Sequence, residues 1–72
     1  MKAYILINTM GGKAKKVLQT IKMIDGVERA NGVYGSYDLV AAIEGEDLVD
    51  LVVDKIRTID GVVKTNTLII AL

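Results

Sequence analysis

The stretch Gly35-Ser36-Tyr37-Asp38 contains the residue types best suited to binding a small polar ligand. A turn that contains glycine can present free backbone N–H groups to a carboxylate, and the Asp38 side chain can accept hydrogen bonds from an ammonium group. Glycine, serine and aspartate are also the residues that a hairpin turn uses for its own geometry, so only Tyr37 lacks a purely structural explanation. The sequence therefore predicts either a ligand-binding site or an ordinary hairpin turn, with Gly35, Ser36, Tyr37 and Asp38 as the candidate residues.

Two other segments have residue types that could bind a ligand. Thr65 and Thr67 alternate with Asn66, so a strand would place both hydroxyls on one face of a sheet and Asn66 on the other. Threonine is also an ordinary strand residue, and β-propensity alone accounts for both. The run Gly11-Gly12-Lys13 resembles a fragment of a phosphate-binding loop, but the full pattern of such loops is missing, which favours a simple strand-to-helix turn.

The composition excludes most classes of catalytic and metal site. The 72 residues include no His and no Cys, so the commonest general base, the commonest metal ligand and all thiol chemistry are absent. There is no paired-carboxylate or serine–base arrangement, and we expect no catalytic residue, no metal and no cofactor. Nine Lys and Arg balance nine Asp and Glu, and this neutral charge does not favour direct binding to nucleic acid.

The length suits one small domain, which we expect to span residues 1–72. Hydrophobic residues make up 51% of the sequence, which is typical of a folded globular chain rather than of a disordered one. The apolar run at the start is too short for a signal peptide, and no segment approaches the length of a membrane span. We therefore expect a cytoplasmic protein that has no disulfide and does not contact a membrane.

Six secondary-structure elements are predicted from the spacing of the apolar residues. Helices are indicated where apolar residues recur every three or four positions, and strands where short apolar runs lie between turn residues. The predicted strands are 3–7, 27–34, 39–43 and 62–72, and the predicted helices are 14–24 and 48–59, the second capped by Asp47 with Asp50 in its first turn. Residues 35–38 would form a tight turn that joins the two middle strands into a hairpin.

An internal repeat indicates how these elements are arranged. The residues Ile24-Asp25-Gly26-Val27 recur 35 positions later as Ile59-Asp60-Gly61-Val62. Two βαβ halves of this kind, joined by a hairpin, form a ferredoxin-like βαββαβ fold. The predicted fold class is therefore α+β, with a four-stranded antiparallel sheet and both helices on one face.

The predicted strands are apolar on both faces. In the first strand, Tyr4 and Leu6 lie on the face opposite to Ile5, and in the third strand Val40 and Ala42 likewise lie opposite to apolar neighbours. Two helices can cover only one face of the sheet, so an isolated chain would expose the other face to water. The sequence therefore predicts a homo-oligomer whose interface includes this second face.

Four segments together resemble the effector-binding domain of the Lrp/AsnC family of transcriptional regulators, also called the RAM domain. They are Ile24–Val27, Val33–Leu39, Ile56–Val62 and Thr65–Ile70, and the resemblance extends over essentially the whole chain. It implies a βαββαβ domain that dimerises through its sheets, assembles into octamers or decamer-like rings, and binds small amino acids between dimers. Carried over to this sequence, it points to Gly35, Tyr37 and Asp38 as ligand-binding residues, with Thr65 and Thr67 as weaker candidates.

Full-length members of this family place a helix-turn-helix DNA-binding domain before the module, whereas the first predicted strand here begins two residues after Met1. The chain is therefore similar to a stand-alone member that does not bind DNA directly. The favoured interpretation is a homo-oligomeric sensor in amino acid metabolism, in which N–H groups around Gly35 hold the carboxylate of an amino acid and Asp38 holds its ammonium. The alternative is a protein-interaction subunit that forms mixed assemblies with a DNA-binding Lrp/AsnC relative and has no ligand of its own. An enzyme ranks last, because fold alone does not decide function and no catalytic constellation is present.

Overall fold

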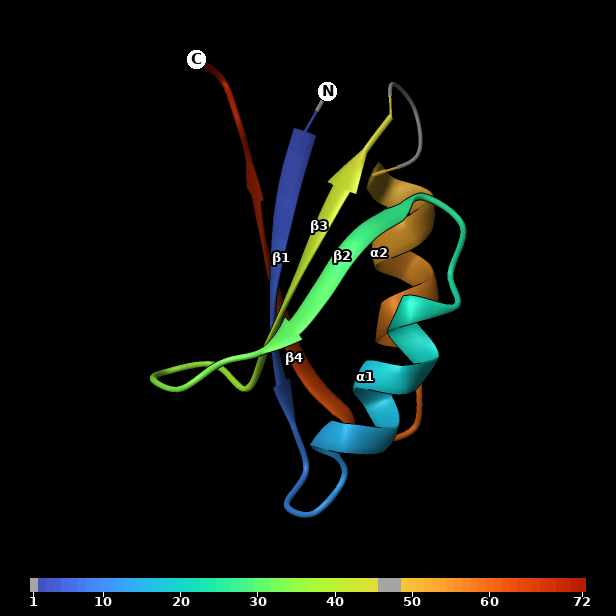
Figure 1. The fold of residues 1–72 in the computed structure, drawn as a ribbon, viewed down its shortest axis with the longest axis vertical. Coiled ribbons are helices and arrows are strands. Elements are labelled where there is room, and N and C mark those ends of the chain that lie inside the picture. Colours follow the sequence, from blue (N-terminus) through green and yellow to red (C-terminus); the bar gives the residue numbers. More distant parts are fainter. Residues whose placement is uncertain (1, 46–48) are drawn as a thin grey trace.

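The computed structural model describes residues 2–45 and 49–72 and contains the six predicted elements in the predicted order (Figure 1). They are β1 (Lys2–Thr9), α1 (Ala14–Lys22), β2 (Val27–Gly32), β3 (Leu39–Glu44), α2 (Val49–Arg57) and β4 (Val62–Ile69). Asp50 lies in the first turn of α2, as predicted, where its charge complements the positive end of the helix dipole. The predicted cap of this helix, Asp47, and the first residue of its apolar stripe, Leu48, lie outside the described residues.

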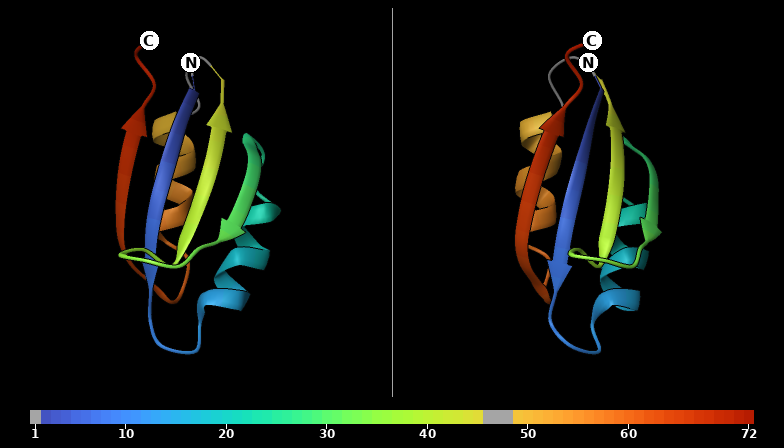
Figure 2. Two further views of the ribbon diagram at one scale, coloured as in Figure 1. Left: turned by 60° about the vertical axis from the view of Figure 1, so that its left-hand side comes forward. Right: turned by 90° about the vertical axis from the view of Figure 1, so that its left-hand side faces the viewer.

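The four strands form one antiparallel sheet in the order β2-β3-β1-β4. Both helices lie on the same face of this sheet (Figure 2), so the predicted ferredoxin-like fold is confirmed. The first strand lies inside the sheet, where Ile5 pairs with Ala41 of β3 on one side and with Thr67 of β4 on the other. Just beyond β4, the Ile70 N–H donates a hydrogen bond of 2.9 Å to the Lys2 carbonyl, which keeps the two outer segments side by side.

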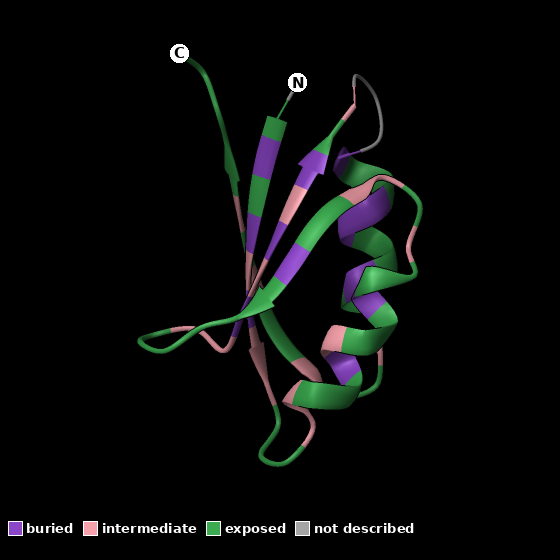
Figure 3. Ribbon diagram, viewed as in Figure 1, coloured by how far each residue is buried: buried purple, intermediate pink, exposed green. Residues whose placement is uncertain are grey.

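The core lies between the sheet and the two helices. Alternate residues of β1 and β3 are buried, as the banding of these strands in Figure 3 shows, because successive side chains of a strand point to opposite faces. The helices contribute residues at three- and four-residue spacing. The fully or nearly fully buried core residues are Ala3, Ile5, Ile7, Val17, Ile21, Ala30, Leu39, Ala41, Ile43, Val49, Val52, Val53 and Ile56.

The other face of the sheet has no helix over it, and we call this surface the open face. Its apolar residues are Tyr4, Leu6, Val40, Ala42 and Leu68, which the strand register brings together across β3, β1 and β4. Tyr4 is 39% exposed and Leu68 is 49% exposed, so the prediction of a second apolar face is confirmed for the single chain. None of the helices in the described ranges is long and apolar enough to cross a membrane.

The two turns that lead from a helix into a strand have the same geometry, as the internal repeat predicts. In each turn a glycine has a positive φ, +96° at Gly26 and +100° at Gly61. Each also shows the same two backbone hydrogen bonds, which for the second turn run from Ile59 N–H to the Ile56 carbonyl and from Val62 N–H to the Ile59 carbonyl. A left-handed conformation of this kind favours glycine, which explains why both repeats carry one.

Several predicted boundaries were wrong. The second strand ends at Gly32 rather than at residue 34, and the last ends at Ile69 rather than at residue 72. The helices end at Lys22 and Arg57, before the ends predicted from their apolar stripes, because Ile24 and Ile59 belong to the turns that follow. As a result, β2 and β3 are joined by the six-residue loop 33–38 rather than by a tight turn of residues 35–38.

Candidate functional site

The loop 33–38 leaves the end of the sheet near the start of α1 and projects from the side of the open face (Figure 1). Two backbone hydrogen bonds close its base. The Val33 N–H donates to the Asp38 carbonyl at 2.9 Å, and the Asp38 N–H donates to the Ile7 carbonyl of β1 at 2.9 Å. The backbone of Asp38 therefore joins the loop both to its own start and to the central strand.

The Asp38 carboxylate is fixed by the end of β1. Its Oδ2 atom accepts a hydrogen bond of 2.7 Å from the Thr9 N–H and a longer one of 3.3 Å from the Thr9 hydroxyl. The sequence predicted this carboxylate as the partner of an ammonium group. In the single chain it has a structural role at this position, so an ammonium ligand would share the carboxylate with Thr9.

The tip of the loop is open to solvent. Gly35 has a φ of +123°, and a Cβ atom placed on it would meet nothing within 4 Å. Between residues 33 and 38, the structure records no hydrogen bond from the backbone N–H groups of residues 34–37 to any other described residue. These N–H groups can therefore bind an anion without first breaking a hydrogen bond within the described part of the chain.

Tyr37 is the one loop side chain that reaches across the sheet. Its hydroxyl accepts a hydrogen bond of 3.3 Å from the side-chain amide of Asn66, which lies on β4 opposite Leu6. Tyr37 is half-buried, whereas Tyr34 in the same loop is fully exposed. Sequence reasoning did not connect Tyr37 with Asn66, although it correctly placed Asn66 on the sheet face opposite to its threonine neighbours.

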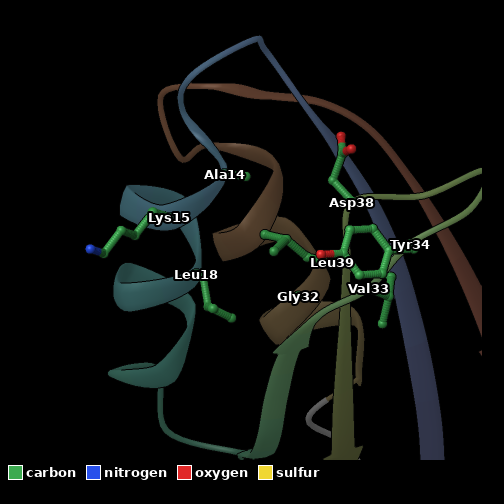
Figure 4. A pocket seen from close by; sticks show the side chains of 8 residues that line it. All are labelled: Ala14, Lys15, Leu18, Gly32, Val33, Tyr34, Asp38 and Leu39. Atoms are coloured by element: carbon green, nitrogen blue, oxygen red, sulfur yellow. The ribbon is translucent and has the colours of Figure 1, made fainter.

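A cavity of about 360 Å³ lies between α1 and the base of the loop (Figure 4). Its apolar lining comes from Ala14 and Leu18 of α1, Val33 of the loop and Leu39 of β3, with Tyr34 at its edge. In Figure 4 the Lys15 amino group points outward and the Asp38 carboxylate points away from Leu18 and Leu39. The cavity can therefore hold an apolar group and has charged groups only at its margin.

Apart from Asp38, sequence reasoning did not assign the cavity-lining residues to the site. The signal was present, because Ala14 and Leu18 are four residues apart and lie on one face of the helix. What the sequence did not contain was the position of the base of the loop beside that face of α1.

The structure separates Thr65 and Thr67 from the other candidates. Both face the helices, since they pair with the buried residues Ile7 and Ile5 of β1, whereas the Tyr37–Asn66 hydrogen bond lies on the open face. The Thr65 hydroxyl accepts a hydrogen bond of 3.1 Å from Arg57 Nε at the end of α2. Arg57 and Thr65 line a separate cavity of about 390 Å³ at the edge of β4. The prediction that both threonines share a face is confirmed, but one chain does not bring them together with the loop.

Within the described ranges, an ion pair joins the residue before α1 to the turn between α2 and β4. Lys13 Nζ lies 2.9 Å from Asp60 Oδ2, and this hydrogen bond lowers the pKa of the Asp60 carboxyl below its ordinary value. The neighbouring Met10 N–H donates to the Gly61 carbonyl at 2.8 Å. Among the described residues no three acidic side chains lie close enough to hold a metal ion.

Comparison with known proteins gives one family model and several similar solved structures. The sequence model described as the Lrp/AsnC ligand binding domain matches residues 2–71. The crystal structure titled FFRP-DM1 is 34% identical, with 97% of each chain covered and a TM-score of 0.86. A hypothetical protein from Pyrococcus horikoshii, PHS023, is 35% identical over 99% of this chain and 89% of its own, with a TM-score of 0.84.

A longer structure shares the fold. AsnC from E. coli has a TM-score of 0.87 at 24% identity, and the match covers 99% of this chain but only 50% of AsnC. No protein with a curated description matches this chain.

Proposed function

Because this chain belongs to the Lrp/AsnC ligand-binding domain family, we propose that it is a sensor module that binds a small amino acid and pairs with a second copy of itself. The ligand occupies the loop 33–38 and the cavity beneath it. The second copy covers the open face. No residue is assigned a catalytic role in this proposal.

The observation that carries the ligand site is the combination of a solvent-exposed loop tip with an apolar cavity at its base. The free N–H groups around Gly35 and Ser36 bind the carboxylate of the amino acid, as backbone N–H groups in turns do for anions. Asp38 binds the ammonium with the carboxylate that also holds Thr9. The ligand side chain enters the cavity between Leu18 and Leu39, which favours aliphatic side chains over charged ones.

The open face supports the dimer. Contiguous apolar surface of this kind is uncommon on isolated chains and normally marks an interface. A second copy offers the same apolar residues, Tyr4, Leu6, Val40, Ala42 and Leu68, in return, as a two-fold symmetric contact requires. Dimers of this kind assemble further into octamers or decamer-like rings, which places the loop of one dimer beside its neighbour. Thr65 and Thr67 then contribute to the ligand site from an adjacent subunit.

A second function is favoured by one specific observation, the engagement of Asp38 with Thr9. A carboxylate that already has a structural partner leaves less affinity for a ligand. The chain would then be a protein-interaction subunit that joins a DNA-binding Lrp/AsnC relative through the open face and has no ligand of its own. Co-purification with such a relative, together with no heat on titration with amino acids, would favour this function.

The first experiment is isothermal titration of the protein with a panel of amino acids, combined with light-scattering mass on a sizing column. We expect an aliphatic amino acid to release heat and to stabilise an assembly made of dimers, because a ligand that bridges subunits favours the state that holds its site. Binding of aspartate or lysine in preference to leucine or valine would contradict the apolar cavity.

Two variants of Asp38 separate its ligand role from its structural role. Asp38→Asn removes the charge but keeps a side-chain oxygen for the Thr9 N–H, whereas Asp38→Ala removes both. If Asp38 binds the ammonium, both variants weaken amino acid binding at least tenfold, or about 1.4 kcal/mol, and only Asp38→Ala also lowers the free energy of unfolding. Unchanged affinity in a folded Asp38→Asn protein would remove Asp38 from the ligand site.

A further inference from the structure

The Tyr37–Asn66 hydrogen bond connects the proposed ligand loop to the surface that the second copy covers. The base of the loop is fixed by bonds from Val33, Asp38 and Thr9. Beyond this base, one hydrogen bond among the described residues connects the rest of the loop to another element. It is the 3.3 Å bond from the Asn66 side-chain amide to the Tyr37 hydroxyl. The orientation of the loop tip therefore depends on this pair.

Asn66 lies on the open face, on the edge strand β4. It pairs with Leu6 of β1 and is two residues from Leu68, so apolar residues of the open face adjoin it. In the single chain Asn66 is exposed and Tyr37 is half-buried, so water competes for the same donor and acceptor. A second copy that covers Leu6 and Leu68 would exclude this water, and a hydrogen bond shielded from water is stronger.

We propose that the Tyr37–Asn66 pair is the link by which dimerisation holds the ligand loop in its binding conformation. Tyr37 is a positioning residue in this scheme, acting through the loop rather than by contact with the ligand. The inference rests on the dimer in the proposed function. By linkage, an amino acid that binds the ordered loop strengthens the dimer by the same factor by which the dimer strengthens binding.

Hydrogen–deuterium exchange of the peptide that contains residues 33–39 tests this link without any ligand. Exchange is measured at protein concentrations on both sides of the dimer dissociation constant, which sedimentation determines for each protein. We expect the loop N–H groups of the wild type to exchange about fivefold more slowly in the dimer, the factor that one net hydrogen bond provides. Tyr37→Phe keeps the ring but loses the acceptor, and Asn66→Ala loses the donor. Both should still dimerise while the loop exchanges at the rate of the monomer.

Asn31→Ala is the matched control, because Asn31 is also an exposed asparagine of the sheet, on β2 opposite Val40 of β3. Its loop should be protected on dimerisation as in the wild type. Equal loop exchange rates in the wild-type monomer and dimer would overturn the proposal. So would a Tyr37→Phe dimer whose loop exchanges as slowly as that of the wild-type dimer. If the wild type stays dimeric at every concentration, the comparison of the wild-type and Tyr37→Phe dimers decides.

Failure of this inference is distinct from failure of the ligand proposal. Amino acid binding is read by calorimetry, whereas the loop–dimer link is read by exchange in the absence of amino acids. A protein that binds an amino acid but shows no dimer-dependent protection keeps its sensor function and loses this link.

Discussion

Two aspartates show how differently the same side chain is used in this chain. Asp38 lies partly buried and holds the end of β1, whereas Asp60 is exposed and pairs with Lys13. The sequence identified Asp38 as chemically interesting, but the same residue type also suits a turn, and its bond to Thr9 depends on a contact 29 residues away in the chain. Long-range side-chain partners of this kind are not encoded in local patterns. The Tyr37–Asn66 bond was missed for the same reason.

The Lys13–Asp60 pair predicts a pH-dependent contribution to stability. The hydrogen bond from Lys13 lowers the pKa of Asp60, so the pair stabilises the fold above the ordinary pKa of an aspartate. The contribution is lost as the pH falls through the lowered pKa. Lys13→Met, which keeps the aliphatic stem, should therefore unfold at lower urea concentration than the wild type at about pH 7, and the two should converge once the pH is well below the lowered pKa of Asp60.

Lys22→Met is the control for this measurement, because Lys22 lies in the last turn of the same helix. The pH dependence of its stability should follow that of the wild type. A stability loss in Lys13→Met that persists when Asp60 is protonated would assign the effect to packing instead of to the ion pair. High salt should also reduce the difference at neutral pH, since both groups are accessible to solvent.

At the scale of elements, apolar spacing was sufficient for the order and type of every helix and strand, but not for their ends. Ile24 and Ile59 continue the apolar stripe of each helix, and yet both belong to the turns that follow. Similarly, Val33 and Tyr34 have the composition of a strand, but the hydrogen bond from Val33 to Asp38 closes a loop there. The identity of an element depends on many residues, whereas its last residue depends on a few hydrogen bonds.

Gly61 makes a testable connection between two elements. At Gly61 the backbone of the α2–β4 turn lies close to the start of α1. A Cβ atom added to Gly61 would lie 3.0 Å from Lys13 Cβ and 3.1 Å from Val17 Cγ2. Val17 is fully buried and has little room to move. Gly61→Ala should therefore lower the free energy of unfolding by about 2–4 kcal/mol, through a left-handed backbone and overpacking together.

Gly12→Ala provides the matched comparison for urea unfolding. Gly12 also has a positive φ, +79°, but a Cβ there would meet nothing within 4 Å. Gly12→Ala should therefore lower the free energy of unfolding only through backbone strain, by about 1 kcal/mol. Equal losses for the two variants would show that the close approach of the turn to α1 contributes no destabilisation.

At the scale of the whole molecule, the unequal covering of the two sheet faces determines the expected assembly. The second apolar face was readable from the sequence because the central residues of the two strands, Ala3–Ile7 of β1 and Leu39–Ile43 of β3, are apolar on both faces. The identity of the covering surface was not readable, since one chain specifies only one side of an interface. The position of Thr65 and Thr67 on the helix side illustrates the same limit, because their distance from the loop depends on neighbouring subunits.

Leu68→Glu should disrupt the proposed dimer. Leu68 is 49% exposed on the open face, so a charge there is tolerated in the monomer but would be buried without a partner in the dimer. We expect the dimer dissociation constant of Leu68→Glu to rise by at least ~100-fold, while its circular dichroism spectrum stays the same as that of the wild type. Leu51→Glu is the control, because Leu51 is 52% exposed but lies on α2, in the other layer. Equal dissociation of both variants would contradict the open face as the interface.

The position of β1 inside the sheet also has a consequence for biosynthesis. Of the six elements β1 is made first, yet one of its two neighbours in the sheet, β4, is made last. As the chain emerges from the ribosome, the edge of β1 that pairs with β4 is therefore the last to meet its partner. Pairings between such distant segments form slowly, and unpaired strand edges invite aggregation. A nascent chain of this fold therefore keeps one edge of its central strand open to other chains or to chaperones until residues 62–69 can pair with β1.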